Sequence, residues 1–289
     1  MMRTMLFLPG NNPGMLQSGG VFGADAVILD LEDAVSPLEK DAARLLAAHS
    51  LKNIDYRGSK RFVRINPLSD GGAADINAIV PSAPDGLVLP KCENIKDILK
   101  QIDLIDKAEK KGQRKVSIVP LIETPLGILQ AAGIAAMHER ISALAFGAED
   151  YTAAVGSARS KSGEEILFAR SIIVNAAAAA SIDSIDTPFT DAADEDGLLQ
   201  DTLLCKSLGF KGKLSINPRQ VDTIHKAFDP SGKEIDWAER VLYALKQAEQ
   251  QGSGVVSVDG KMVDAPVAAR AKRIIELARL TGCYEEVLA

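Results

Sequence analysis

Residues 26–31 read AVILDL and residues 117–122 read SIVPLI. Both are nearly continuous apolar runs, which is typical of parallel strands that are buried on both faces. Similar short runs recur along the chain, separated by longer helix-like stretches, in units of roughly 22–40 residues. The expected strands cover residues 3–8, 25–31, 61–66, 86–90, 115–123, 143–147, 184–187 and 213–217.

Eight strand–helix units within about 220 residues predict an α/β fold of the (β/α)8 TIM-barrel type. The alternative, an open doubly wound sheet, is disfavoured because no GxGxxG sequence follows the first strand. Residues at the expected helix starts agree with the barrel. Ser36 is expected to cap one helix, with Glu39 completing a capping box, while Thr124 and Asp194 begin two others.

The chain continues well beyond the eighth expected strand. We expect residues 1–228 to form the barrel and residues 229–289 to form a C-terminal helical and hairpin extension. The extension comprises a helix over 236–251, a hairpin over 252–264 that turns at Asp259-Gly260, and a last helix over 265–280. A barrel closes without it, so the extension is either a packing appendage, or a lid or subunit-exchange arm over an active site.

Composition limits the class of protein. The 289 residues are 46% hydrophobic and 25% charged, which excludes disorder over most of the chain. The net charge of −6 and the lack of a basic block disfavour a nucleic-acid partner, and no apolar run suggests a membrane span. Three widely spaced cysteines, Cys92, Cys205 and Cys283, indicate a reducing, cytoplasmic setting.

Charged residues gather where the expected strands end. Barrel enzymes carry their chemistry at the carboxyl ends of the strands, and charged side chains are rarely buried unless they are paired or bind a metal. The expected mouth holds six carboxylates and two cations, which are Asp30, Glu32, Asp33, Glu123, Glu149, Asp150, Arg64 and Lys91. Several such groups at one mouth predict a functional site rather than a core.

An excess of carboxylates without histidine or cysteine favours a hard cation such as Mg2+. Glu123 and Asp150 follow neighbouring strands and are the expected ligand pair, although each could instead form a salt bridge or cap a helix. Glu149 is the weaker candidate because it adjoins Asp150 and should point elsewhere. Either Mg2+ or Mn2+ would suit this donor set.

Two cations complete the expected mouth. Arg64 is suited to a bidentate grip on a substrate carboxylate or enolate oxygen, and it could also pair with Glu32 or Asp33. Lys91 could act as a Schiff-base nucleophile or as a charged hydrogen-bond donor. The many carboxylates nearby would keep it protonated, so the donor role is favoured.

Nine stretches that run in order along nearly the whole chain resemble one family. They are MLFLPGNNPGML, ADAVILDLEDAVSPLEKDAAR, RINP, LVLPK, PLIETPLGI, FGAEDYTAAVG, ILFARSIIVNAA, GFKGKLSINPRQV and DGKMVDAPVAARA. In them the chain is similar to the β subunits of citrate lyase, within the metal-dependent citryl-, malyl- and citramalyl-thioester lyases of the HpcH/HpaI aldolase type. Relatives often carry histidine before the proline after the last strand, and Asn217 at this position favours the citrate lyase branch.

The resemblance implies a (β/α)8 barrel, Mg2+ on Glu123 and Asp150, and substrate contacts from Arg64 and Glu123. It also implies a role for Asp264, because the equivalent aspartate of relatives reaches into the active site of a neighbouring subunit. This predicts a homo-oligomer. Asp264 could instead only cap the last helix.

The implied reaction cleaves a citryl thioester, carried on an acyl carrier protein or on CoA, to oxaloacetate and the acetyl thioester by a retro-aldol or reverse Claisen step. Arg64 would stabilise the enolate and Asp264 would protonate it. Asp30, Glu32 and Asp33 would orient Arg64, Lys91 and the metal-bound waters. The candidate catalytic set is Arg64, Asp264, Glu32, Asp33 and Lys91.

Other functions are open at this point. A lyase acting on malyl-CoA or citramalyl-CoA would share the metal site. A phosphoenolpyruvate-using barrel would need a phosphate grip, and few basic residues cluster at the strand ends. A non-catalytic scaffold subunit would be expected to lack a strand-end carboxylate or Arg64. By resemblance, the protein partners would be the α (transferase) and γ (acyl carrier) subunits of citrate lyase.

Overall fold

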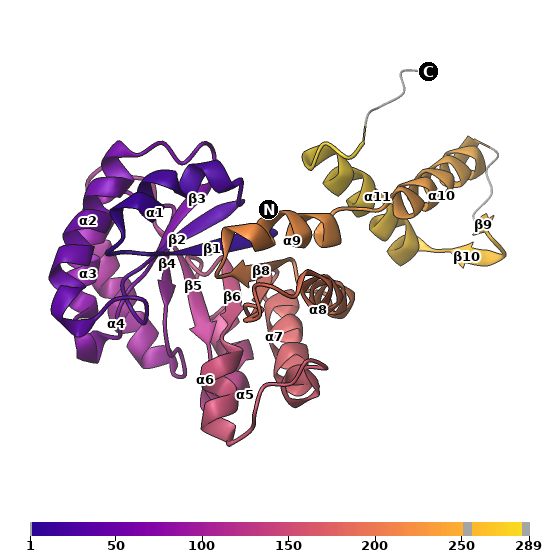
Figure 1. The fold of residues 1–289 in the computed structure, drawn as a ribbon. Coiled ribbons are helices and arrows are strands. Elements are labelled where there is room, and N and C mark those ends of the chain that lie inside the picture. The colour runs from indigo at the N-terminus through magenta and orange to yellow at the C-terminus, as the bar shows by residue number, and fades with distance from the viewer. Residues whose placement is uncertain (1, 251–255, 285–289) are drawn as a thin grey trace. The chain divides into compact units, whose positions relative to one another are not determined.

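Eight parallel strands form a closed barrel in the computed structural model, which describes residues 2–250 and 256–284 (Figure 1). The strands are β1 (Thr4–Pro9), β2 (Ala26–Asp30), β3 (Lys60–Arg64), β4 (Gly86–Leu89), β5 (Ser117–Ile122), β6 (Ala143–Phe146), β7 (Asp183–Asp186) and β8 (Gly212–Ser215). They pair in sequence order, and β8 closes the barrel by pairing with β1. The predicted (β/α)8 barrel is therefore confirmed.

Helices alternate with the strands and lie outside them (Figure 1). They are α1 (Pro13–Ser18), α2 (Lys40–Asn53), α3 (Gly72–Ile79), α4 (Ile95–Ala108), α5 (Pro125–Ala136), α6 (Ala148–Val155), α7 (Leu167–Ala179), α8 (Glu195–Leu208) and α9 (Val221–Phe228). Short 3-10 helices cover Gly19–Phe22, Pro37–Glu39, Leu68–Asp70, Val80–Ser82, Glu164–Ile166 and Pro218–Gln220.

Helix caps account for two of the helix starts. Thr124 Oγ1 accepts from the Gly127 amide at 3.0 Å, and Asp194 Oδ1 accepts from the Gly197 amide at 2.9 Å. The predicted capping box at Ser36 is wrong. A 3-10 turn over Pro37–Glu39 precedes α2, and the Ser36 side chain makes no cap hydrogen bond.

The barrel interior is filled by side chains that alternate along the strands with those that face the helices. Small side chains such as Ala26 and Ala145 share this cluster with the larger Met5 and Phe62. The outward side chains of β2 and β5 are covered by helices and are almost all buried as well. Burial on both faces explains why AVILDL and SIVPLI lack the polar alternation of a solvated strand.

The chain divides into two compact units, Met1–His225 and Lys226–Ala289, and α9 runs across the division. The second unit contains α10 (Gly232–Gln250), β9 (Val256–Val258), β10 (Lys261–Val263) and α11 (Ala265–Leu280). Its own core consists of Ala238, Val241, Val263, Ala271 and Ile275, with partly buried apolar side chains packed against it.

The strands β9 and β10 form an antiparallel hairpin. It turns at Asp259 and Gly260, as predicted, and both have positive φ, 53° and 73°, which suits a two-residue turn between twisted strands. The helix α10 begins at Gly232 rather than at residue 236. Residue 251 of the expected helix and residues 252–255 of the expected hairpin lie outside the described residues.

Two further features bear on the sequence-based expectations. Cys92 and Cys205 are buried free thiols, and Cys283 is an exposed one. Among the helices of the described ranges, none is both long and apolar enough to cross a membrane.

Candidate active site

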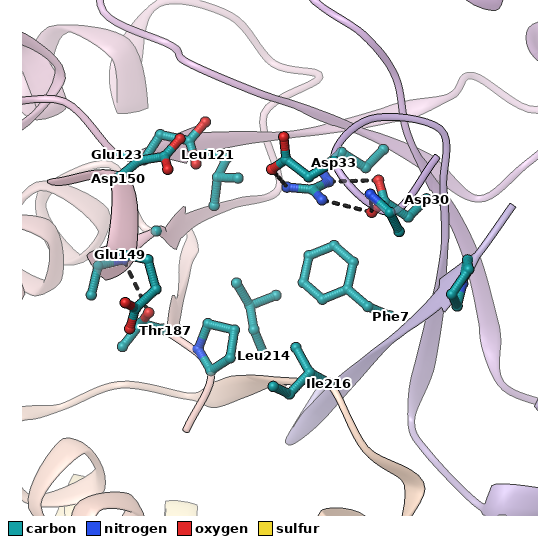
Figure 2. A pocket seen from close by; sticks show the side chains of 16 residues that line it. Phe7, Asp30, Asp33, Leu121, Glu123, Glu149, Asp150, Thr187, Leu214 and Ile216 are labelled. Carbon is teal, nitrogen blue, oxygen red and sulfur yellow. Dashed lines mark hydrogen bonds and ion pairs between the residues drawn. The ribbon is translucent and has the colours of Figure 1, made fainter. Parts of the chain in front are cut away.

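The carboxyl ends of the strands surround a pocket of about 410 Å³ (Figure 2). One part of its wall is charged and the other part is apolar. The charged side chains are Asp30, Asp33, Arg64, Glu123, Glu149 and Asp150, and the larger apolar ones are Phe7, Leu121, Leu214 and Ile216. This is the end of the barrel at which TIM-barrel enzymes carry their chemistry.

Arg64, the last residue of β3, is held by carboxylates that follow β2. Its Nε and Nη2 donate to the two oxygens of Asp30 at 2.7 and 2.6 Å, and Nη1 donates to Asp33 at 3.3 Å. The guanidinium carbon lies 4.9 Å from the centre of the Phe7 ring, in cation–π contact. Three of the five guanidinium N–H groups are used in these bonds, so two remain for a ligand.

The charge of Arg64 is secured by this environment. Burial by itself lowers the pKa of Arg64, but the hydrogen bonds and charge of Asp30, together with the charges of Glu32 and Asp33, raise it above its ordinary value. The pocket therefore contains a permanently charged donor group with a fixed orientation.

Glu32 is buried between two cations. Its Oε2 lies 2.9 Å from Arg64 Nη1, as an ion pair without hydrogen-bond geometry, and its Oε1 lies 3.8 Å from Lys91 Nζ. Burial is the main reason that the pKa of Glu32 is raised to about 7, while Arg64 lowers it and Asp33 raises it. Even between two cations, this buried carboxyl group therefore ionises less readily than an ordinary glutamate.

Glu123 follows β5 and is 4% exposed. Its Oε1 accepts from the Lys91 amide at 2.7 Å, and Lys91 has the left-handed φ of 51°. Burial is the main cause that raises the pKa of Glu123 to about 8, and the charges of Glu32 and Asp150 add to it. Gly147 leaves space beside the other oxygen, since a Cβ there would lie 2.6 Å from Glu123 Oε2.

Glu123 and Asp150 are chemically suited to hold a hard cation. Both line the pocket (Figure 2), and the charge of Asp150 helps to raise the pKa of Glu123, so a cation between them would relieve a repulsion. Mg2+ commonly takes one or two protein carboxylates and completes its octahedron with water and substrate oxygens. Within residues 2–250 and 256–284, no group of three or more His, Cys, Asp or Glu side chains could hold a metal.

Of the other two charged groups near this pair, Glu149 has a separate partner and Lys91 lies beside Asp150. Glu149 Oε1 accepts from Arg159 Nε at 3.1 Å. Lys91 Nζ lies 4.0 Å from Asp150 Oδ2, and its side chain is half exposed. An ammonium between Glu32 and Asp150 suits the donor role that the sequence favoured.

The barrel end brings together six of the seven predicted site residues, namely Glu32, Asp33, Arg64, Lys91, Glu123 and Asp150. The seventh, Asp264, belongs to the second unit. There it caps α11, because its Oδ1 accepts from the Val267 amide at 3.1 Å. The cap is the simpler of the two roles that the sequence left open for Asp264, and it leaves the catalytic role a prediction.

Sequence reasoning missed part of the pocket wall. Phe7 supports Arg64, and Thr187 Oγ1 accepts from the Ala148 amide at 3.0 Å at the far side. Leu214 and Ile216 supply the apolar wall. Thr187 directly follows β7, so reading the end of that strand would have found it, and the inward alternation of β1 and β8 would have found Phe7 and Leu214.

Comparisons with known proteins agree with this geometry. Residues 3–218 match the family model described as HpcH/HpaI aldolase/citrate lyase. The chain is 43% identical to a citrate lyase subunit beta of Haemophilus influenzae over 288 residues, which cover 98% of this chain and 99% of that one. It is 32% identical to a mitochondrial citramalyl-CoA lyase of Rattus norvegicus over 289 residues, covering 96% and 86%.

A solved structure has the same fold. The protein CitE of Mycobacterium tuberculosis, in complex with magnesium, acetoacetate and coenzyme A, superposes with a TM-score of 0.80 at 29% sequence identity. The match covers 96% of this chain and 98% of that one.

Proposed function

The chain belongs to the HpcH/HpaI aldolase/citrate lyase family, and from this we infer that it is a carbon–carbon lyase that cleaves a citryl thioester to oxaloacetate and the acetyl thioester. The observation that carries the proposal is the 43% identity to a citrate lyase β subunit over nearly the full length of both chains. The pocket supports it, since a cation-binding carboxylate pair and a fixed arginine line the same cavity.

In this proposal Glu123 and Asp150 hold Mg2+, or Mn2+ in its place. When bound, the ion supplies a Lewis acid for the alcohol and carboxylate oxygens of the substrate. Support comes from the donor set of this pocket and from the magnesium complex of the similar Mycobacterium tuberculosis protein.

Arg64 binds the negatively charged oxygen atoms of the substrate or of the enolate. Its two remaining N–H groups can donate to a substrate carboxylate or to the enolate oxygen. Asp30, Asp33 and Glu32 keep the guanidinium oriented, so its charge is in place before the carbon–carbon bond breaks.

The reaction balances without a further reactant. The tertiary alcohol gives up its proton to water, the bond between the alcohol carbon and the CH2 next to the thioester breaks, and the electron pair passes to the enolate of the acetyl thioester. The enolate then takes a proton, which we assign to Asp264, and Asp264 regains a proton from water. Lys91, between Glu32 and Asp150, serves as a charged donor. The roles of Asp264 and of the metal ligands rest on the family resemblance.

The C-terminal extension and the partners belong to the same proposal. We propose that the extension expected over residues 229–289 is a lid or subunit-exchange arm that brings Asp264 to a neighbouring active site in a homo-oligomer. The citryl group would arrive on an acyl carrier protein or on CoA, with citrate lyase α and γ subunits as partners. The free cysteines favour the cytoplasm as the compartment.

The second candidate is a lyase acting on citramalyl-CoA or malyl-CoA, which the 32% identity to a citramalyl-CoA lyase favours. A non-catalytic scaffold has less support, because the sequence keeps Arg64 and all the carboxylates that are expected at the strand ends.

Oxaloacetate release from citryl-CoA, followed through malate dehydrogenase and NADH with and without Mg2+, tests the proposal. Malyl-CoA and citramalyl-CoA are run alongside and assayed for glyoxylate and pyruvate. Metal-dependent release from citryl-CoA alone is expected. Cleavage of another thioester instead would show that the proposed substrate is wrong. If no thioester is cleaved, including a citryl group on an acyl carrier protein, the proposed lyase activity is wrong.

A further inference from the structure

Lys40, the first residue of α2, directs its ammonium group at two backbone carbonyls and a side-chain amide oxygen rather than at a carboxylate. Its Nζ donates to the carbonyl oxygens of Leu31 and Glu32 at 2.8 and 2.6 Å, and to Asn66 Oδ1 at 2.7 Å. An ammonium has three N–H donors, so these bonds use all of them. Both carbonyls belong to the loop after β2 that carries Glu32 into the site.

Helix electrostatics does not explain a lysine at this position. The amino end of a helix carries partial positive charge, which disfavours a cation in the first turn by a few tenths of a kcal/mol or more. Lys40 nevertheless begins α2. Lys40 therefore departs from the usual charge preference of a helix start, and the three hydrogen bonds of its ammonium group account for its position.

Asn66 ties the same loop to the outer helices. It is 1% exposed, and its Nδ2 donates to the Leu31 carbonyl at 2.9 Å and to Asp75 Oδ2 at 2.7 Å. Asp75, on α3, is in turn held by Arg44 of α2, whose Nε donates to it at 2.7 Å. The loop carbonyls are thus fastened to two helices through buried polar groups.

The amides of the loop are fastened from the other side. Asp30 Oδ1 accepts from the Glu32 amide at 3.0 Å, and Oδ2 accepts from the Ala34 amide at 3.2 Å. Asp30 also holds Arg64. The loop therefore has little freedom to move, because its carbonyls are tied to Lys40 and its amides to Asp30.

We propose that Lys40 and Asn66 are positioning residues for the reaction. Neither lines the pocket. By holding the carbonyl groups of Leu31 and Glu32, they keep the Glu32 carboxylate 2.9 Å from Arg64 and 3.8 Å from Lys91. The effect on turnover rests on the proposed function, whereas the effect on the loop does not.

Lys40→Met tests the proposal, since it removes the ammonium and keeps most of the apolar stem. We expect faster hydrogen exchange at the amides of residues 32 and 34 and a fall in kcat of roughly 100-fold, the effect of misplacing a reacting group by about 1 Å. The Mg2+ activation midpoint should stay unchanged, because the expected metal ligands follow other strands. Lys40→Arg, which keeps a cation with several donors, should recover part of both losses.

Lys107→Met is the matched control, because Lys107 is an exposed lysine on α4 that pairs with Asp103 on the same helix. It should alter neither readout. Asn66→Ala should reproduce the effects of Lys40→Met, and the double variant should lose less than the sum, since both side chains act on one loop.

Wild-type exchange at residues 32 and 34 in Lys40→Met would overturn the proposal. So would a fall in kcat that merely follows a general loss of Tm, with Lys40→Arg giving no rescue. If the wild-type protein cleaves none of the thioesters, the exchange measurement still decides whether Lys40 holds the loop, so the two proposals fail separately.

Discussion

Asp30 grips Arg64 with both carboxylate oxygens, at 2.7 Å to Nε and 2.6 Å to Nη2. The same two oxygens accept the amides of Glu32 and Ala34. One buried carboxylate therefore orients the arginine of the pocket and shapes the loop that carries the neighbouring acids. Bidentate pairs of this kind are directional as well as strong.

Replacing Asp30 with asparagine places an amide N–H against the guanidinium and leaves only Glu32 and Asp33 to balance its buried charge. We expect kcat/KM to fall by roughly 100-fold and the free energy of unfolding to fall by about 1–3 kcal/mol. Steady-state kinetics and chemical denaturation measure the two. Asp103→Asn, which removes an exposed pair with Lys107, should cost at most about 1 kcal/mol. Unaltered kinetics in Asp30→Asn would contradict the role of the grip.

The metal assignment predicts a shared effect of two conservative variants. Glu123→Gln and Asp150→Asn each replace a carboxylate oxygen that Mg2+ prefers by an amide, so both should lose Mg2+ binding in calorimetry and Mg2+-dependent activity together. The double variant should lose little more than either single one, because the site is already broken. A fully active double variant would refute the assignment.

Gly147→Ala probes the same site without changing a charge. The new Cβ would lie 2.6 Å from Glu123 Oε2 and 2.7 Å from Glu123 Cβ, so the whole side chain must shift and its carboxylate is displaced from its present position. We expect the Mg2+ affinity to fall by roughly 10–100-fold. Gly232→Ala, where no atom lies within 4 Å of the added Cβ, is the control and should bind Mg2+ normally. Equal affinities in the two variants would show that Glu123 does not need this space.

The barrel could be predicted because its signal is repeated and local. Strands such as β2 and β5 are short apolar runs, because they are buried on both faces. The polar residues of β3, β7 and β8 make those three strands weaker signals, and the regular alternation with helices compensates for them. The caps at Thr124 and Asp194 could also be predicted, because each cap joins a side-chain oxygen to the amide three residues later in the sequence. The capping box predicted at Ser36 was wrong because a 3-10 turn over Pro37–Glu39 precedes α2. The sequence does not distinguish that turn from the first turn of α2.

Arg64, Glu123 and Asp150 were found because strand ends converge in a barrel. The pairing of Arg64 with Glu32 and Asp33 was also expected and is present in the structure. The two-oxygen grip of Asp30 on Arg64 depends on side-chain directions that no spacing encodes. The bonds of Lys40 to the carbonyls of Leu31 and Glu32 appear only in three dimensions.

Stability below neutral pH should depend on Asp25. Burial raises the pKa of Asp25, but the hydrogen bonds and charge of Arg3 outweigh it, so the pKa lies below its ordinary value. A carboxylate with a lowered folded-state pKa stabilises the fold above its unfolded pKa of about 4, and this contribution is lost as the pH falls through the folded value. Asp25→Asn should therefore be less stable than wild type at pH 6, with the difference shrinking below about pH 4. Urea unfolding at several pH values measures this, and a pH-independent difference would contradict it.

Asp264→Asn separates the two roles of Asp264. Asparagine caps helices about as well as aspartate, so the bond to the Val267 amide and the stability of α11 should be kept. Asparagine cannot deliver a proton, and general acid catalysis contributes about 10²–10⁴-fold, so turnover should fall by that order while Mg2+ binding and Tm stay unchanged. Asp259→Asn, in the hairpin of the same unit, is the control for a lost charge.

Mixing Asp264→Asn with the Arg64→Ala variant should restore some activity if Asp264 serves a neighbouring subunit, because mixed oligomers then contain an intact site. Wild-type turnover in Asp264→Asn would leave this aspartate a helix cap and nothing more.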